Sequence, residues 1–287
     1  MRSAITPYVF LERGLNMEGI KDITGLRILI KGAGEMATGI AHRLYMANMR
    51  HIVMTEIDRP LTVRRTVAFS EAVYEGQWQV EGVTAGLVKD YDEILKVWNE
   101  KRVAVIVDAE WKIIGVFKPH VVVDAIMAKR NIGTTKEEAL IVIGVGPGFN
   151  APSDVHAIIE SNRGHDLGRV IYNGFAEPHT GIPGPVMGYT KKRVLRSPAS
   201  GMAKGVRAIG DEIKKGEIVL YIDNVPVYAP LDGIVRGIIR DIYVKADEKI
   251  GDIDPRGIKV YCYTITEKAR AIGGGVLEAI MHYAVTP

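Results

Sequence analysis

The stretch LRILIKGAGEMATGIAHRL, residues 26–44, decides the fold of this chain. The apolar run 28–30 is typical of a buried strand, and a helical pattern over Met36–Met46 follows the glycines at once. A strand, a glycine turn and a helix N-terminus, in this order, form the phosphate-binding corner of a Rossmann-type unit. The stretch therefore predicts a cofactor-binding α/β domain.

Three residues of this corner have separate predicted roles. Gly32 lets the chain turn sharply, Gly34 leaves room for a phosphate, and Ala37 lets the helix lie close to its strand. Glu56 ends a second expected strand, HIVMTEI (51–57), about 20 residues further on, where an acid would hold a ribose hydroxyl. The alternative is a doubly wound domain in which the glycines only make a turn.

Composition narrows the class of protein. The 287 residues are 47% apolar and 25% charged, which is typical of a globular protein, and the net charge of +3 is spread along the chain. No cationic face for nucleic acid and no apolar run of about 20 residues is present. The single cysteine excludes a disulfide framework, and residues 1–16 do not resemble a signal peptide. We expect a cytoplasmic protein without membrane or nucleic-acid partners.

Strand and helix patterns alternate through the first half, which predicts a mostly parallel sheet. Strands are expected over 79–88, 102–109 and 120–128, and within 139–150, where the strand runs into a glycine-rich loop. Helices are expected over 61–73 and 90–101, the latter capped by Asp90. We expect an N-terminal extension (1–25), a Rossmann-like domain (26–190), a small β domain (191–262) and a C-terminal helix (263–287). The Gly- and Pro-rich stretch 173–188 is either the boundary between the Rossmann-like domain and the small β domain or an ordered surface loop.

An internal repeat defines the small β domain. SPASGMAKG (197–205) recurs as APLDGIVRG (229–237), so that proline and glycines align. Two such units resemble the halves of a barrel-sandwich domain of the biotinyl or lipoyl type. The hairpin Tyr221–Pro230 has no lysine to carry a prosthetic group, which favours a structural or docking role.

The C-terminal pattern Glu267–Tyr283 is helical but contains three consecutive glycines, 273–275. Each glycine costs a helix about 1 kcal/mol relative to alanine. We therefore expect a backbone or a ligand to pack closely on that face, or the helix to begin after the glycines.

Charged residues follow two of the expected strands. Arg64, with Arg59 and Arg65, follows Glu56 and could meet phosphates or simply be solvated. Asp124 ends the strand VVVD, and Lys129 follows it. Such a cluster beyond a buried strand is expected to bind the cofactor; alternatively, Asp124 caps a helix and Lys129 complements its end.

A second glycine-rich loop contains Gly144, Gly146 and Gly148, and could hold another anionic group. Ser153 is expected to cap a following helix that places His156 and Glu160 on one face.

Further along the chain, His165 and Asp166 are candidates for a proton-transfer pair, or for a hydrogen-bonded turn. Cys262 lies in an alternating pattern and is a candidate chalcogen-carrying thiolate, or else a small buried apolar residue. No CxxC or HExxH spacing occurs, so no metal site is predicted.

Five segments together resemble a known family. They are KGAGEMATGIAHRL (31–44), MTEIDRPLTVRRTVAFSEAVYEG (54–76), VVVDAIMAKRN (121–131), GVGPGFNAPSDVHAIIESNRGHDLGRVIY (144–172) and ARAIGGGVLEAI (269–280). They are similar to the YqeB-like accessory proteins of the selenium-dependent molybdenum hydroxylase system. The resemblance covers nearly the whole chain after residue 25, and the Rossmann-like part is distantly reminiscent of XdhC-type insertion chaperones of the molybdenum cofactor.

The resemblance implies a maturation factor. Such a protein would hold a molybdopterin-type cofactor, or a selenium-bearing form of it, and deliver it to an apo-hydroxylase of the xanthine dehydrogenase type. The chain lacks the cysteine clusters of iron–sulfur centres, so the resemblance does not make it a hydroxylase. The alternatives are an NAD(P)-dependent oxidoreductase with His165 and Asp166 as acid and base, and a scaffold with a vestigial site. Homo-oligomerisation stays open.

Overall fold

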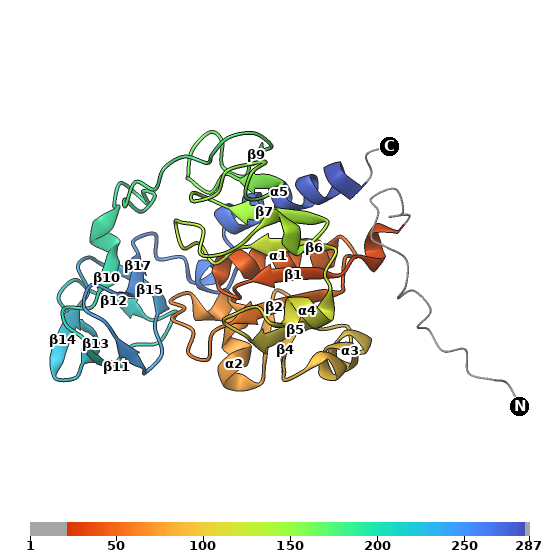
Figure 1. The fold of residues 1–287 in the computed structure, drawn as a ribbon. Helices are drawn as coiled ribbons and strands as arrows, with labels where there is room; N and C mark the ends of the chain where they lie inside the picture. The colour runs from red at the N-terminus through yellow and green to blue at the C-terminus, as the bar shows by residue number, and fades with distance from the viewer. Residues whose placement is uncertain (1–21, 285–287) are drawn as a thin grey trace, which may run out of the picture.

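A computed structural model describes residues 22–284, and a nine-stranded sheet forms its centre (Figure 1). Every pair of neighbouring strands is parallel except the two at the edges, β3–β4 and β8–β9, which confirms the predicted mostly parallel sheet. In spatial order the strands are β3 (Gln77–Val80), β4 (Val83–Val88), β5 (Val103–Val107), β2 (Ile52–Glu56), β1 (Ile28–Lys31), β6 (Val121–Asp124), β7 (Ile141–Val145), β8 (Ala157–Ile159) and β9 (Val170–Ile171).

Alternate side chains of each strand enter separate apolar clusters on the two faces of the sheet. Ile28 and Ile30 of β1 pack with α1 (Glu35–Met46) and α5 (Glu267–Ala284), whereas Leu29 packs with α3 (Tyr91–Asn99) and α4 (Ile113–Phe117). The predicted helix at 90–101 is confirmed as α3, and the side chain of Asp90 accepts a hydrogen bond from the backbone N–H of Glu93 at 2.9 Å. No helix within 22–284 has the length and apolar character needed to cross a bilayer.

The C-terminal helix α5 runs unbroken through its three glycines. At Gly273 a side chain would meet the backbone of Gly39 in α1, and at Gly275 it would meet the backbone of Gly168. Close backbone packing, the first of the alternatives considered, therefore explains two of the glycines.

Three predicted elements are wrong. Residues 61–73 form no long helix but two 3₁₀ turns, Arg65–Val67 and Phe69–Glu71, before the short helix α2 (Ala72–Glu75). The Phe69 N–H donates to Thr38 Oγ1 and the Ser70 N–H to the Ala33 carbonyl, so contacts with the glycine corner replace helical bonds.

Residues 79–88 form part of the hairpin β3–β4, because Glu81 and Gly82 both adopt positive φ and turn the chain. Residues 153–160 contain the buried strand β8 instead of a helix capped by Ser153. The apolar run Ala157–Ile159 there pairs with β7, and this tertiary pairing overrides the helical spacing.

Two four-stranded sheets follow and share one apolar cluster that includes Leu220, Val235 and Ile250; we call them the β module. The first is ordered β10 (Val194–Arg196), β17 (Lys249–Asp254), β15 (Gly233–Ile238) and β12 (Glu212–Ile213); the second is β14 (Val225–Tyr228), β13 (Ile218–Ile222), β11 (Gly201–Gly205) and β16 (Tyr243–Val244). The sequence repeat is visible in the pairing, since β11 pairs with β16 as β15 pairs with β12. A barrel-sandwich class for this module stays a prediction.

The β module lies beside the large sheet (Figure 1). Arg65 donates to the Ile238 carbonyl at 2.8 Å, and Arg240 pairs with buried Glu71 at 2.5 Å. Between β9 and the 3₁₀ turn Lys191–Arg193, the chain forms no regular helix or strand. It has only two isolated bridges, from Gly174 to Ala151 and from Val186 to Tyr189. Residues 1–21 of the expected N-terminal extension (1–25) lie outside the described residues. The other domain limits stay predictions.

His120 makes the stability of the large domain depend on pH. Its Nδ1 accepts the backbone N–H of Arg27 at 3.0 Å, and burial together with the Arg27 charge lowers the pKa of His120 to about 4. The unfolded chain, with a pKa near 6.5, binds the proton first, so stability present above pH 6.5 should fall by about 2 kcal/mol between pH 6.5 and 4.

Urea unfolding at a series of pH values measures this effect. His120→Asn keeps an acceptor for the Arg27 amide but does not titrate, so its stability should vary less over the same interval. An equal dependence on pH in both proteins would refute the assignment to His120.

Candidate cofactor site

A pocket of about 280 Å³ lies at the carboxyl ends of β1, β2, β5 and β6, where a Rossmann-type sheet binds its ligand. It brings together three of the predicted residues: Gly32, Gly34 and Glu56. Residues that sequence reasoning did not select complete the lining, among them Thr55, Leu61, Thr62, Asp108, Trp111 and Ile132.

Gly32 turns the chain as predicted but offers no amide to a ligand. Its φ of +93° suits glycine, and its N–H donates to the Thr55 carbonyl at 2.9 Å, within the sheet. The next amide, of Ala33, donates to Glu56 Oε2 at 2.9 Å. Neither amide is therefore free to bind a phosphate, because pairing within the fold already uses both donors.

The N-terminus of α1 supplies the donors that remain. Within residues 22–284 the N–H groups of Gly34, Glu35 and Met36 find no acceptor, and no side chain caps the helix. A Cβ placed on Gly34 would have only Thr62 Oγ1 near it, at 4.0 Å, so open space lies beside these amides. Unpaired amides and the positive end of the helix dipole together attract anions.

Ala37 lies behind this surface and not in it. Its side chain is 1% exposed and packs in the apolar cluster between α1 and the sheet. Its predicted role in close packing of helix and strand agrees with this position, and it does not line the pocket.

Glu56 lies at the end of β2 and faces the glycine corner. Its Oε2 accepts from Ala33 and its Oε1 from the backbone N–H of Ile57, both at 2.9 Å. Burial raises the pKa of Glu56, and these two hydrogen bonds oppose the rise. Because each carboxylate oxygen has a second lone pair, Glu56 can still accept a hydroxyl from a ligand.

Arg64 does not face the pocket, which corrects its predicted role. Its Nη2 donates to the carbonyls of Tyr261 and Thr264, each at 3.0 Å, and its Nη1 reaches Glu35 at 3.3 Å. Arg65 is likewise used by the β module, and Arg59 is largely exposed. Arg64 thus holds the segment that leads into α5, and Arg65 holds the end of β15.

The three glycines of the second loop lie against other parts of the chain. A side chain on Gly144 would overlap the ring of Phe149, one on Gly146 would overlap Ser161, and one on Gly148 would overlap the Arg130 backbone. Close packing against the chain itself thus accounts for all three glycines, and an anionic group at this loop stays a prediction.

Asp124 is buried next to the pocket but does not enter it. Its Oδ2 accepts the Thr134 hydroxyl at 2.7 Å, and its Oδ1 accepts the Ile126 N–H at 3.2 Å, so it caps no helix. Lys129 is exposed and does not line the pocket. The predicted pairing of Asp124 and Lys129 at one site does not occur.

Lys31 is the buried polar residue that sequence reasoning missed. Its ammonium group bonds Thr134 at 2.7 Å and Glu138 at 2.7–2.8 Å, and lies 3.7 Å from the centre of the Trp111 ring. Burial lowers its pKa, and the carboxylates of Glu138 and Asp124 oppose this. Its contact with the ring helps to hold Trp111 in the wall of the pocket. The sequence signal that could have revealed Lys31 is a lysine directly after the apolar run 28–30, within the same strand.

His165 and Asp166 form no pair. His165 is exposed, and Asp166 instead accepts from Arg169 at 3.1 Å. Asp166 borders a different cavity, of about 360 Å³, beside β9. The predicted acid–base pair is therefore absent from the cofactor pocket.

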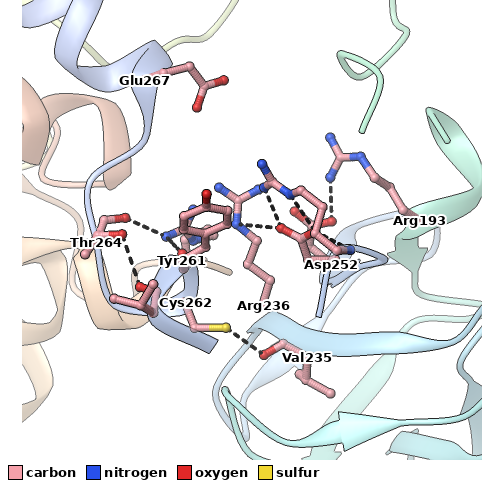
Figure 2. Close-up of polar contacts among 12 residues, drawn as sticks. Arg193, Val235, Arg236, Asp252, Tyr261, Cys262, Thr264 and Glu267 are labelled. Carbon is pink, nitrogen blue, oxygen red and sulfur yellow. Dashed lines mark hydrogen bonds and ion pairs between the residues drawn. The ribbon is translucent and has the colours of Figure 1, made fainter. Parts of the chain in front are cut away.

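Cys262 is fully buried, and its thiol lies 3.8 Å from the Val235 carbonyl (Figure 2). Burial raises the pKa of this thiol despite the nearby charges of Arg64 and Arg236. The thiolate hypothesis needs an exposed sulfur with a lowered pKa, and it is therefore wrong. The alternative, a small buried apolar residue, agrees with the structure.

This burial should make the thiol unreactive. We expect native Cys262 to react with an aromatic disulfide reagent at least about 100-fold more slowly than the unfolded chain, because the reactive thiolate must be exposed. Cys262→Ala should keep full activity in any hydroxylase-activation assay. Fast labelling of the native protein, or loss of activation in the alanine variant, would restore the carrier hypothesis.

No group of three His, Cys, Asp or Glu side chains that could hold a metal ion occurs among the described residues. The pocket offers free amides, three carboxylates, those of Glu35, Glu56 and Asp108, and apolar walls. This lining suits an organic molecule whose anionic group lies against the amides and away from the carboxylates.

No family model matches this chain. Over 255 residues it is 46% identical to YqeB of Escherichia coli K12, an uncharacterized protein; the match covers 88% of this chain and 47% of YqeB. The similarity supports the YqeB-like family. The chain spans about half the length of this curated relative, whose own activity is undefined.

Solved structures offer only weak likenesses. An aspartoacylase family protein from Mesorhizobium loti is 12% identical, covers 74% of this chain and 58% of its own, with a TM-score of 0.24. The ectoine utilization protein EutE (DoeB) from Ruegeria pomeroyi is 8% identical, covers 74% of this chain and 61% of its own, with a TM-score of 0.23. Scores this low carry no argument about fold or function.

Proposed function

We propose that this protein binds a phosphate-bearing cofactor of the pterin dinucleotide type and delivers it to an apo-enzyme, a molybdenum hydroxylase of the xanthine dehydrogenase type. The observation that carries the binding step is the row of unpaired amides at Gly34, Glu35 and Met36, which faces an open pocket. The delivery step and the partner come from the resemblance to the YqeB-like proteins.

The residues present fit the phosphate end of such a cofactor. Its phosphate oxygens would accept from the amides at the start of α1, without a basic side chain, because Arg64 and Lys31 are both used elsewhere. The molybdenum would be held by the pterin, since the described residues offer no metal-ligand set and Cys262 is buried.

Glu56 and Trp111 define the sides of the site. The free lone pairs of Glu56 would accept a ribose hydroxyl, and its charge would disfavour a phosphate at the same place. The indole of Trp111, which Lys31 supports from behind, offers an apolar wall against which a planar ring can stack. These residues bind and orient; none of them is placed to catalyse a reaction, and catalysis is no part of the proposal.

A second candidate, an NAD(P)-dependent oxidoreductase, has the same Rossmann-type corner and Glu56 in its favour. Against it, His165 is exposed, Asp166 accepts from Arg169, and neither residue lines the pocket where this candidate would need an acid–base pair. A carrier of bound cofactor needs no such pair.

The small molecule that the protein retains tests the proposal. The protein is purified from cells that make molybdenum cofactor and then denatured, and the released material is assayed for oxidised-pterin fluorescence and for nicotinamide. We expect pterin in amounts approaching one per chain. Nicotinamide would support the oxidoreductase instead, and an empty protein under tight-binding conditions would favour a scaffold.

A further inference from the structure

Four arginines gather where the β module meets the large sheet, and we call them the junction cluster: Arg64, Arg193, Arg236 and Arg256. Figure 2 shows Arg193 and Arg236 reaching from different segments toward the region below Glu267 of α5. Arg64, Arg193 and Arg236 are each at least 94% buried. Buried guanidinium groups normally have carboxylate or carbonyl partners that account for them.

Three members of the cluster have such partners. Arg64 donates to two carbonyls of the chain, and Arg193 donates to Asp252 at 2.6 Å. Arg256 makes a two-pronged contact with Asp254, at 2.9 and 2.6 Å. These contacts tie the segments together and explain why the arginines are there.

Arg236 has no comparable partner. It donates no hydrogen bond to any residue in 22–284, although it is only 6% exposed and its Nε is enclosed. The nearest carboxylate oxygen is Asp254 Oδ2, 3.6 Å from Nε, and Arg256 already occupies it. A largely buried guanidinium whose Nε is enclosed without an acceptor, and whose ion pair is this long, is disfavoured unless something else accepts from it.

The junction cluster carries four positive charges, and three carboxylates, those of Asp252, Asp254 and Glu35, lie near Arg236. Burial and the neighbouring charge of Arg64 lower the pKa of Arg236, and these carboxylates oppose the fall. The Nε atoms of Arg64 and Arg193 are also enclosed and without partners. Further out, burial and the charge of Arg163 lower the pKa of Lys268, at the start of α5.

We propose that Arg236 anchors a binding site for a tetrahedral oxyanion, such as a phosphoryl group, at the junction between the large sheet and the β module. A guanidinium presents its donors as a planar fork that matches two oxygens of a phosphate. Arg64 and Arg193 add positive charge from the two sides. An anion bound here would neutralise the excess positive charge of the junction cluster and link the β module to the large sheet.

This site is separate from the cofactor pocket and does not depend on the proposed function. None of the four arginines lines the pocket; the side chain of Glu35, which does, only accepts from Arg64. The bound anion could be free phosphate or the phosphate of a nucleotide. Comparing inorganic phosphate with adenosine monophosphate distinguishes these sources.

Thermal unfolding tests the proposal. It is best done in the Gly34→Asp variant, in which the new carboxylate should exclude phosphate from the cofactor pocket. Phosphate replaces chloride in the buffer at constant ionic strength. We expect Tm to rise by about 5 °C when phosphate is about 100 times its dissociation constant. No rise with either inorganic phosphate or the nucleotide would overturn the proposal.

Variants assign the response to Arg236. Arg236→Met should abolish the rise and leave Tm in chloride unchanged or higher, because Asp254 keeps its partner Arg256. Arg196→Met is the matched control, since it removes a half-exposed arginine of the same module and should keep the full response. If the Tm of Arg236→Met still rose with phosphate, the proposed anion site would be refuted, and that result would say nothing against the cofactor pocket.

A second variant covers the case in which Arg236→Met does not fold. Arg236→Lys should weaken phosphate binding at least about tenfold, and unchanged binding in this variant would equally refute the site.

Discussion

Replacing Gly34 with aspartate should lower the affinity for the bound cofactor at least about 100-fold while leaving the protein folded. The new carboxylate would stand beside the amides of Glu35 and Met36, where the phosphate is proposed to lie, and like charges at that distance cost several kcal/mol. About 2.7 kcal/mol is enough for a hundredfold loss. Equilibrium binding of the released cofactor to the apo-protein measures the effect.

Gly34→Ala is the matched control. Gly34 has a φ of −68°, and the nearest atom to an added methyl group would be Thr62 Oγ1 at 4.0 Å, so alanine is accommodated without strain. We expect its affinity to stay within about threefold of the wild type, and both variants to unfold at nearly the same urea concentration. Equal losses of affinity in both variants would mean that shape, and not charge, governs this position.

Alanine substitutions at two adjacent glycines of α5 should change stability in opposite directions. At Gly275 an added methyl group would overlap the Gly168 carbonyl and approach Ile159 to 2.9 Å, which should cost about 2–3 kcal/mol of unfolding free energy. At Gly274 nothing lies within 4 Å, so alanine should instead stabilise the helix by about 1 kcal/mol. Urea unfolding of the two variants measures both changes.

Stability changes of opposite sign in the two variants would distinguish the effect of close packing from the effect of helix propensity. Propensity alone predicts stabilisation at both positions, because both lie in the same helix. Destabilisation at Gly274, or stabilisation at Gly275, would contradict the close contact between α5 and the loop that contains Gly168.

The sequence was sufficient for the local features of the Rossmann-type part. The apolar runs at 103–107, 121–124 and 141–145 indicated buried parallel strands, and the glycine corner correctly placed the start of α1. These features follow from burial and backbone geometry within a few residues, so a single sequence contains them.

The errors occurred where distant parts of the chain decide the outcome. Three glycines at 144–148 look like a phosphate loop, yet Phe149, Ser161 and the Arg130 backbone fill the space beside them. Arg64 follows a strand end, as a phosphate ligand would, but carbonyls some 200 residues later in the chain accept its hydrogen bonds. Spacing along the sequence cannot show which donors the fold itself uses.

The central claim is that an anionic group lies against the amides of Gly34, Glu35 and Met36. The most direct measurement is a crystal structure of the protein bound to the small molecule released from it. The account predicts a phosphate oxygen within about 3 Å of at least two of these three nitrogens. A phosphate bound elsewhere, with these amides left to water, would contradict it.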